Sequence, residues 1–210
     1  MAEDTEDFAR IHRQFLSRLP GVRQMQSSFA LRTVFANQTG QLYSVIGLEA
    51  LRANASRTRR SIEASPFTRG VRGAMSDFFG SIRGDFEQAA RKSAEIHDMM
   101  QAMYTRFARE QNVERYEPPQ FSMLKYQKEI DRLERAYNQH FNTLWNMVSK
   151  AKFALMRRFF ETIASRVKHL YDIANRDVES WLKAVMSPLE TQVREHHIQL
   201  RRRLESVKRI

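Results

Sequence analysis

The sequence contains no cysteine, which excludes disulfide bonds and metal sites built on thiolates. A chain without disulfides suits a reducing compartment, and we expect a cytoplasmic location. No run of 18 apolar residues occurs, so no segment is expected to cross a bilayer as a helix. The acidic start MAEDTED lacks the basic and apolar regions of a secretory signal.

Helix-breaking residues are also scarce over most of the chain. All seven glycines precede Asp85, and the prolines beyond that residue are Pro118, Pro119 and Pro188. Because glycine and proline are the main residues that interrupt helices, their scarcity predicts long uninterrupted helices in the second half. The content of 42 % hydrophobic and 28 % charged residues is that of a folded chain.

Sequence signatures of catalysis are missing as well. There is no His-Glu-x-x-His, no glutamate has a histidine three residues later, and no phosphate-binding Gly-x-x-x-x-Gly-Lys-Ser/Thr occurs. Residues 77–80 (DFFG) match the Asp-x-x-Gly signature of GTPases, but they lie inside a helical apolar pattern, and we interpret the match as chance. We therefore expect no catalytic site, no metal site and no cofactor, and the chain is not expected to be an enzyme.

Apolar periodicity indicates how the helices are arranged. Apolar residues recur at spacings of three or four from Met123 to Val185, which predicts one helix for the 68 residues between Pro119 and Pro188. Such a helix would be roughly 100 Å long. A second long helix is predicted from Pro66 to about Val113, with Ser65 as its cap. A break at 114–121 would join the two as a hairpin, with Ser122 capping the next helix and a kink near 187–188.

The first part of the chain predicts shorter helices. One is expected over residues 8–19, and residues 22–64 read as helical with breaks near Gly40 and Gly47. The predicted fold class is therefore all-α: an elongated, stalk-like bundle of four to six helices with two long antiparallel helices. The predicted regions are 1–64, with N-terminal helices and an arginine-rich segment, and 65–210, with the long-helix stalk.

Positive charge is the clearest functional signal. The net charge is +11, and residues 21–84 contribute +6 from nine arginines and three acidic residues. Such a field favours phosphate backbones or anionic lipid headgroups as partners. Arginines beside apolar residues are typical of an interfacial membrane element, and the candidate contact residues are Arg52, Arg57, Arg59, Arg60, Arg69, Arg72, Phe67, Val71, Phe78 and Phe79. The alternative is a solvated arginine face whose apolar residues belong to the core.

A second basic patch lies near the C-terminal end, at Arg201, Arg202, Arg203, Lys208 and Arg209. It could bind lipid, nucleic acid or an acidic partner, or be an ordinary charged helix end. No nucleic-acid-binding motif is present, and the aromatic residues follow the apolar stripe, which disfavours a base-stacking platform. Nucleic acid is therefore the less favoured partner, and a purely structural scaffold is the remaining alternative.

The sequence from Arg83 onward resembles the helical region that follows the GTPase domain in bacterial dynamin-like proteins. The similar stretches are EIHDMMQAMYTRFAREQNV, PPQFSMLKYQKEIDRLERAY and SPLETQVREHHIQLRRRLESVKRI. The resemblance implies a helical stalk that self-associates through its long helices and contacts an anionic membrane as a peripheral protein. The GTPase motifs of the family are absent from this sequence, so GTP hydrolysis is expected only with a GTPase domain supplied in cis or in trans.

Overall fold

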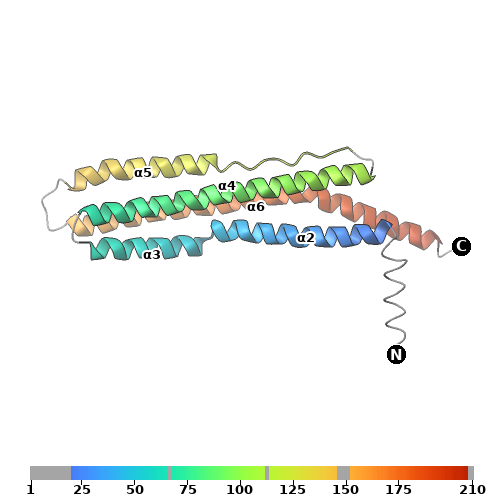
Figure 1. Cartoon of the computed structure of the whole chain (residues 1–210), viewed down its shortest axis with the longest axis horizontal. Coiled ribbons are helices and arrows are strands. Elements are labelled where there is room, and N and C mark those ends of the chain that lie inside the picture. Colours follow the sequence, from blue (N-terminus) through green and yellow to red (C-terminus); the bar gives the residue numbers. More distant parts are fainter. Residues whose placement is uncertain (1–19, 66–67, 112–113, 146–151, 208–210) are drawn as a thin grey trace, which may run out of the picture. The chain divides into compact units, whose positions relative to one another are not determined.

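The computed structural model describes residues 20–65, 68–111, 114–145 and 152–207, and this part of the chain contains only helices and connecting segments. Its five helices are α2 (Pro20–Val45), α3 (Leu48–Ala64), α4 (Thr68–Gln111), α5 (Leu124–Trp145) and α6 (Lys152–Val207) (Figure 1). The all-α prediction is confirmed for these residues. The helix predicted over 8–19 lies outside them. No described helix has an apolar stretch of the length needed to span a bilayer.

The chain divides into two compact units. One comprises residues 40–186, which we call the helical core unit, and the other combines residues 1–39 with 187–210. The predicted regional boundary at 64/65 falls between α3 and α4, inside the helical core unit. Helix α6 continues through Pro188 to Val207. The rest of the description concerns the helical core unit unless stated otherwise.

Helix breaks were expected near Gly40 and near Gly47, and the structure has a break only at Gly47. Helix α2 passes through Gly40 without a break, whereas Gly47 separates α2 from α3 with extended backbone angles, φ −69° and ψ 140°. A β-carbon at Gly47 would lie 3.1 Å from the carbonyl oxygen of Tyr43. A side chain at Gly47 would therefore press on this carbonyl, whereas a β-carbon at Gly40 would meet nothing within 4 Å.

Serine side chains mark the helix boundaries. The backbone N–H of Leu124 donates to Ser122 Oγ over 3.4 Å, so Ser122 caps α5 as predicted. Ser65 differs from its predicted role, because its hydroxyl donates to the carbonyl oxygen of Ser61 at the end of α3. The backbone N–H of Ser65 also bonds Ile62, so this serine closes α3.

The single helix predicted between Pro119 and Pro188 is wrong. Helices α5 and α6 are separate, and Tyr126 of α5 donates a hydrogen bond to Asp177 of α6 over 2.6 Å. In one continuous helix these residues would lie roughly 76 Å apart. Tyr137 and Phe159 also stack, with ring centroids 5.9 Å apart. The apolar stripe therefore folds back on itself, and α5 runs antiparallel to α6.

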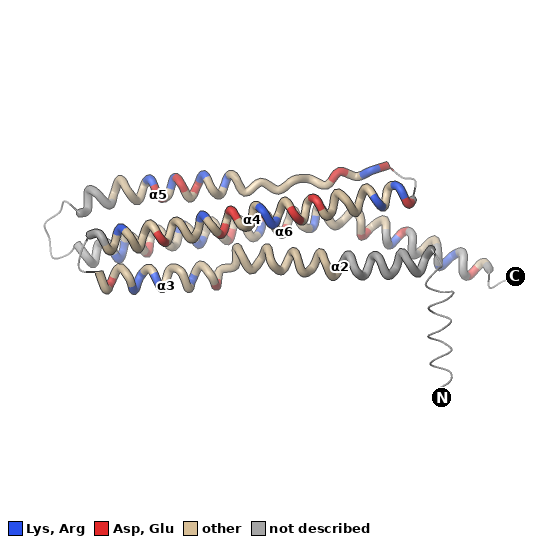
Figure 2. The backbone as a smooth tube through the Cα atoms, viewed as in Figure 1, with Lys and Arg blue, Asp and Glu red and all other residues tan. Residues whose placement is uncertain are grey.

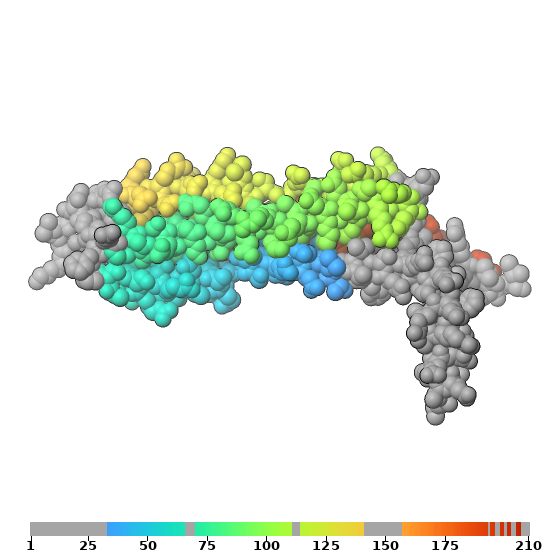
Figure 3. Space-filling model, in the orientation of Figure 1, coloured from blue at the N-terminus to red at the C-terminus, as the bar shows by residue number. Residues whose placement is uncertain are grey.

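Helix α4 packs against every other long element of the unit. It contacts α3 and α5 directly (Figure 3). Aromatic contacts join it to α6: Phe78 meets Phe160 at 5.4 Å between ring centroids, and Phe86 meets Tyr171 at 5.0 Å. The order of these pairs shows that α4 and α6 run in the same direction. The predicted two-helix hairpin is thus replaced by three helices, α4, α5 and α6, around a shared aromatic core.

An extended segment, residues 114–123, follows α4 and includes the predicted break at 114–121. Three side chains hold it. His97 Nε2 donates to the carbonyl oxygen of Pro118 over 3.1 Å, and Trp181 Nε1 donates to that of Pro119 over 2.7 Å. Tyr116 packs its ring 4.8 Å from that of Tyr104. Because the extended backbone has no helical partners for its carbonyl groups, side chains from α4 and α6 supply the donors.

Candidate functional site

The apolar residues proposed for membrane contact lie in the protein core. Val71, Phe78 and Phe79 are each 0 % exposed. Phe79 approaches Tyr137 of α5, with ring centroids 5.9 Å apart, and Phe78 approaches Phe160 of α6. The prediction that these three side chains insert into a lipid surface is therefore wrong for this structure, because α3, α5 and α6 already cover them. The DFFG match to a GTPase signature has the same explanation, since its phenylalanines are core residues of α4.

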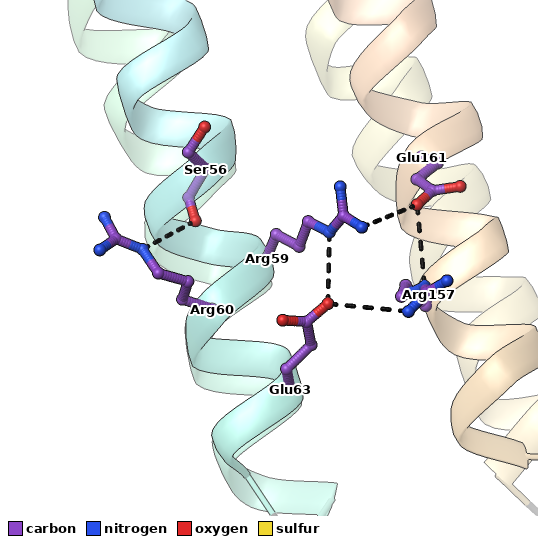
Figure 4. Close-up of polar contacts among 6 residues, drawn as sticks. All are labelled: Ser56, Arg59, Arg60, Glu63, Arg157 and Glu161. Carbon is purple, nitrogen blue, oxygen red and sulfur yellow. Dashed lines mark hydrogen bonds and ion pairs between the residues drawn. The ribbon is translucent and has the colours of Figure 1, made fainter.

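Two of the proposed arginines take part in ion pairs. Arg52 bonds Glu49 of the same helix over 2.6 Å. Arg59 lies in a ring of alternating charges, the α3–α6 ion-pair ring, which consists of Arg59, Glu63, Arg157 and Glu161 (Figure 4). The four nitrogen–oxygen distances are 3.2, 3.8, 3.8 and 3.9 Å. These side chains neutralise one another and join α3 to α6, which lowers their availability for an external anion.

The other proposed residues near them have varied surroundings. Arg57 and Arg60 are exposed, and Arg60 Nε donates to the carbonyl oxygen of Ser56 (Figure 4). Arg72 is exposed and close enough to Tyr137 to affect its titration. Phe67 and the side chain of Arg69 lie outside the described residues. The sequence cluster is thus divided among the core, the α3–α6 ion-pair ring and exposed arginines.

The C-terminal patch is described only in part, and it belongs to the unit that includes residues 187–210. Arg201 and Arg202 are exposed, and Arg201 pairs with Glu205 over 3.7 Å. The side chain of Arg203, and residues Lys208 and Arg209, lie outside the described residues. This patch therefore remains a prediction.

Exposed basic residues without a carboxylate partner are spread over several helices of the helical core unit. Within the part of the chain that the structure describes, they are Arg57, Arg60, Arg91, Arg109, Arg115, Lys128, Arg135, Arg158, Arg166 and Arg176. They outnumber the exposed carboxylates without a basic partner in the same residues, which are Asp77, Glu87, Glu114 and Glu117. Figure 2 shows charges of both signs along α3, α4 and α5. The surface is therefore mixed, with an excess of unpaired cations.

Two tyrosine–aspartate hydrogen bonds join α6 to its neighbours. Tyr171 donates to Asp85 of α4 over 2.7 Å, and burial raises the pKa of Asp85 while the hydrogen bond opposes that rise. Tyr126 donates to Asp177, which also receives a bond from Lys125 over 2.5 Å. The bonds from Lys125 and Tyr126 lower the pKa of Asp177. Both pairs connect helices, and Lys125 adds a third ionisable group only at Asp177.

One open hollow lies on α4 near the extended segment, with a volume of about 480 Å³. Its walls are Asp98, Gln101, Ala102, Thr105, Arg106, Arg109 and Arg115. Arg106 is paired with Glu110 over 2.7 Å, and Asp98 adds a carboxylate to the wall. No group of three potential metal ligands occurs among the described residues. The hollow offers neither an activated nucleophile nor a ligand set for a metal.

Comparison with protein families, with curated proteins and with solved structures gives no match to this chain. The residues themselves must therefore support any functional proposal. The unpaired cations of α5 and α6 were missed by reading charge along the sequence, because within each helix they are spaced seven to ten residues apart. The sequence feature that could have revealed these cations is their helical spacing, because it places arginines that are distant in sequence on one side of a helix.

Proposed function

We propose that this chain is a non-catalytic helical module that adsorbs electrostatically to an anionic membrane surface and self-associates along its long helices. The observation that carries the proposal is the excess of exposed Lys and Arg side chains without carboxylate partners in the helical core unit. Each basic residue near an anionic bilayer contributes about 1 kcal/mol of attraction. A handful of free cations is enough for measurable adsorption at moderate salt.

The burial of Val71, Phe78 and Phe79 specifies the mode of binding. With these residues in the core, the large apolar side chains exposed among the described residues are Val34, Leu124 and Ile198, which are not aromatic and are far apart in sequence. The proposal therefore excludes an inserted apolar wedge and relies on charge. No aromatic side chain is exposed among the described residues, which also disfavours single-stranded nucleic acid, because that ligand binds largely by base stacking.

The lengths of the helices support the assembly part of the proposal. Helix α4 has 44 residues and α6 has 56, whereas globular helices average about 11. Long amphipathic helices are typical of stalks and coiled assemblies. This agrees with the sequence resemblance to the stalk region of dynamin-like proteins. On this proposal a GTPase domain would act in cis or in trans, and this module would be cytoplasmic and peripheral.

Co-sedimentation with vesicles tests the proposal. Vesicles of phosphatidylcholine with phosphatidylserine are expected to sediment the protein at low salt, and phosphatidylcholine alone is not. Raising the salt concentration should release the protein, because exposed charges are screened over about 10 Å at 0.1 M. Binding that ignores lipid charge would contradict the proposal. A gel-shift titration with duplex DNA in the same buffers tests the nucleic-acid alternative, and analytical ultracentrifugation tests self-association.

A further inference from the structure

The basic residues of α5 recur at helical spacing. Among the described residues, Lys128 and Arg135 form no ion pair, whereas Lys125 pairs with Asp177 and Arg132 with Glu129. Lys125, Lys128, Arg132 and Arg135 follow one another at intervals of three, four and three residues, which places them along one side of the helix. Lys125 shows which side this is, because its ammonium group reaches Asp177 of α6. The opposite side of α5 carries the buried residues Tyr126, Ile130 and Tyr137. The basic row of α5 therefore faces outward, next to α6.

Helix α6 carries a matching row. Residues 158, 162, 166, 169, 173 and 176 occupy one side at spacings of three and four, and they include Arg158, Arg166 and Arg176 but no carboxylate. All three arginines are exposed, and none forms an ion pair among the described residues, although Arg176 contributes to the lowered pKa of Asp177. The row extends over roughly 27 Å of helix. Its other members are Thr162, His169 and Ile173, so nothing acidic interrupts it.

Together the two rows form the α5–α6 basic face: Lys125, Lys128, Arg132, Arg135, Arg158, Arg166 and Arg176. Carboxylates border it on both helices, and the following are engaged in ion pairs: Glu129 with Arg132 at 3.8 Å, Asp177 with Lys125, Asp131 with Arg83, and Asp172 with Lys168. The rows belong to one surface because α5 and α6 pack antiparallel along their length, through Tyr126–Asp177 and Tyr137–Phe159. The arginine-rich α3, by contrast, shares its surface with Glu49, Glu63 and Glu161.

From this arrangement we infer that the α5–α6 basic face is the surface by which the chain contacts an anionic lipid bilayer. The inference deepens the proposed function and depends on it. A straight row on one side of a helix meets a flat anionic surface at every position at once, and no lipid-facing apolar side chain is required. The charged headgroups replace carboxylate partners that the protein itself does not provide.

Charge-neutralising variants with equal net charge test the inference. The α6 variant carries Arg158→Gln, Arg166→Gln and Arg176→Gln, and the matched control carries Arg57→Gln, Arg60→Gln and Arg91→Gln. All six arginines are exposed, and none forms an ion pair among the described residues. Partitioning onto phosphatidylserine-containing vesicles is expected to fall about fivefold per neutralised arginine in the α6 variant, and clearly less in the control.

The outcomes separate the inference from the proposed function. If the unmodified protein does not bind anionic vesicles, both fail. If it binds and the two variants weaken binding equally, the proposed function stands and the assignment of this face is overturned. If the α6 variant loses binding to duplex DNA but keeps its binding to anionic vesicles, the assignment of this face is also overturned. Should that variant lose helicity by circular dichroism, the α5 variant Lys128→Gln, Arg132→Gln, Arg135→Gln replaces it against the same control.

Discussion

The two halves of α4 are held by different kinds of polar contact. Around residues 68–84, which contain four glycines, the neighbouring elements are helices, and the polar contacts are ion pairs: Arg83 with Asp131 and Glu134, and the α3–α6 ion-pair ring nearby. Residues 85–111 contain no glycine. Besides the bond from Tyr171 to Asp85, side chains here donate to backbone carbonyls: His97 to Pro118, and Tyr104 to Val185 over 2.6 Å.

The difference follows from what each neighbour offers. A helix satisfies its own backbone groups, so only its side chains remain for contact with another helix, and long charged side chains meet at the exposed edges. An extended segment leaves its carbonyl oxygens free, and buried donors from the core satisfy them. Tyr104 differs from this pattern, because it bonds the carbonyl oxygen of Val185 within α6, three residues before Pro188. We expect the bonds from buried side chains to backbone carbonyls to contribute more stability than the exposed ion pairs.

The largest expected effect comes from the aromatic core that both halves share. Phe86 is 0 % exposed, and its ring lies 5.6 Å from that of Tyr126 and 5.0 Å from that of Tyr171 between centroids. Phe86→Ala should lower the free energy of unfolding by about 3–5 kcal/mol, because it removes buried apolar area and leaves a cavity. Urea unfolding of the variant and the parent protein measures this loss in free energy of unfolding. Leu124→Ala is the control, since Leu124 is 53 % exposed and should cost under about 1 kcal/mol.

The second effect concerns the extended segment. Trp181→Phe removes the donor to the Pro119 carbonyl and should cost about 1–3 kcal/mol. Residues 114–123 should then exchange their amide hydrogens faster than the rest of the helical core unit. Unchanged protection of this segment would mean that Trp181 does not hold it. Lys183→Ala on the same helix is the control, because Lys183 only pairs with the exposed Glu179.

The third prediction addresses the glycine-containing half directly. A β-carbon at Gly73, Gly80 or Gly84 would meet nothing within 4 Å, so alanine at each should stabilise α4 by up to about 1 kcal/mol. Gly70→Ala is the matched control: its β-carbon would lie 2.5 Å from Ser65 Oγ, and the serine must move. Thermal unfolding of the four single variants checks this. An equal gain at all four positions would contradict the reported packing at Gly70.

The fourth prediction compares the two aspartates of the tyrosine hydrogen bonds. Burial raises the pKa of Asp85, so its contribution to stability is present at low pH and is lost as pH rises through its folded pKa. Lys125 and Tyr126 lower the pKa of Asp177, so its contribution is present at neutral pH and is lost as pH falls. At pH 7, Asp85→Asn should therefore stabilise and Asp177→Asn destabilise. Unfolding of both variants between pH 3 and pH 7 should show opposite slopes relative to the parent; parallel curves would count against this account.

The smallest effect is expected at the α3–α6 ion-pair ring. Its side chains are about half exposed, and such pairs contribute about 0–1 kcal/mol. Glu161→Gln should lower the free energy of unfolding by less than about 1 kcal/mol, and the difference should vanish at high salt. A larger loss that persists at 1 M salt would place this ring among the strong contacts and remove the distinction between the two halves.

The helical character of the described chain was predictable, because apolar positions such as Ile130, Val167 and Val178 repeat at helical spacing and are buried. The separation of α5 from α6 was not predictable in the same way. Residues 146–151 contain no glycine or proline, and the apolar spacing runs through them. What favours two helices is the pairing of Tyr126 with Asp177, a contact between positions far apart in sequence.

The candidate site was predicted less well than the fold. Grouping arginines by sequence drew attention to α3, where Arg59 is neutralised by Glu161 from a distant helix. Position along the chain also grouped Phe78 and Phe79 with those arginines. The two phenylalanine side chains are, however, buried in the core. Local sequence reports charge density, whereas partner choice depends on which carboxylates the fold brings near each cation.

The open glycines of α4 also make the protein convenient to study. Since the chain has no cysteine of its own, a single cysteine at Gly73, Gly80 or Gly84 would carry one reactive thiol into empty space on the outer side of the helix. A fluorophore or spin label attached there would report from α4, and the β-carbon that carries it would have no neighbouring atom within 4 Å. The same positions could therefore serve as fixed reference points for measuring how this helix is oriented on a vesicle.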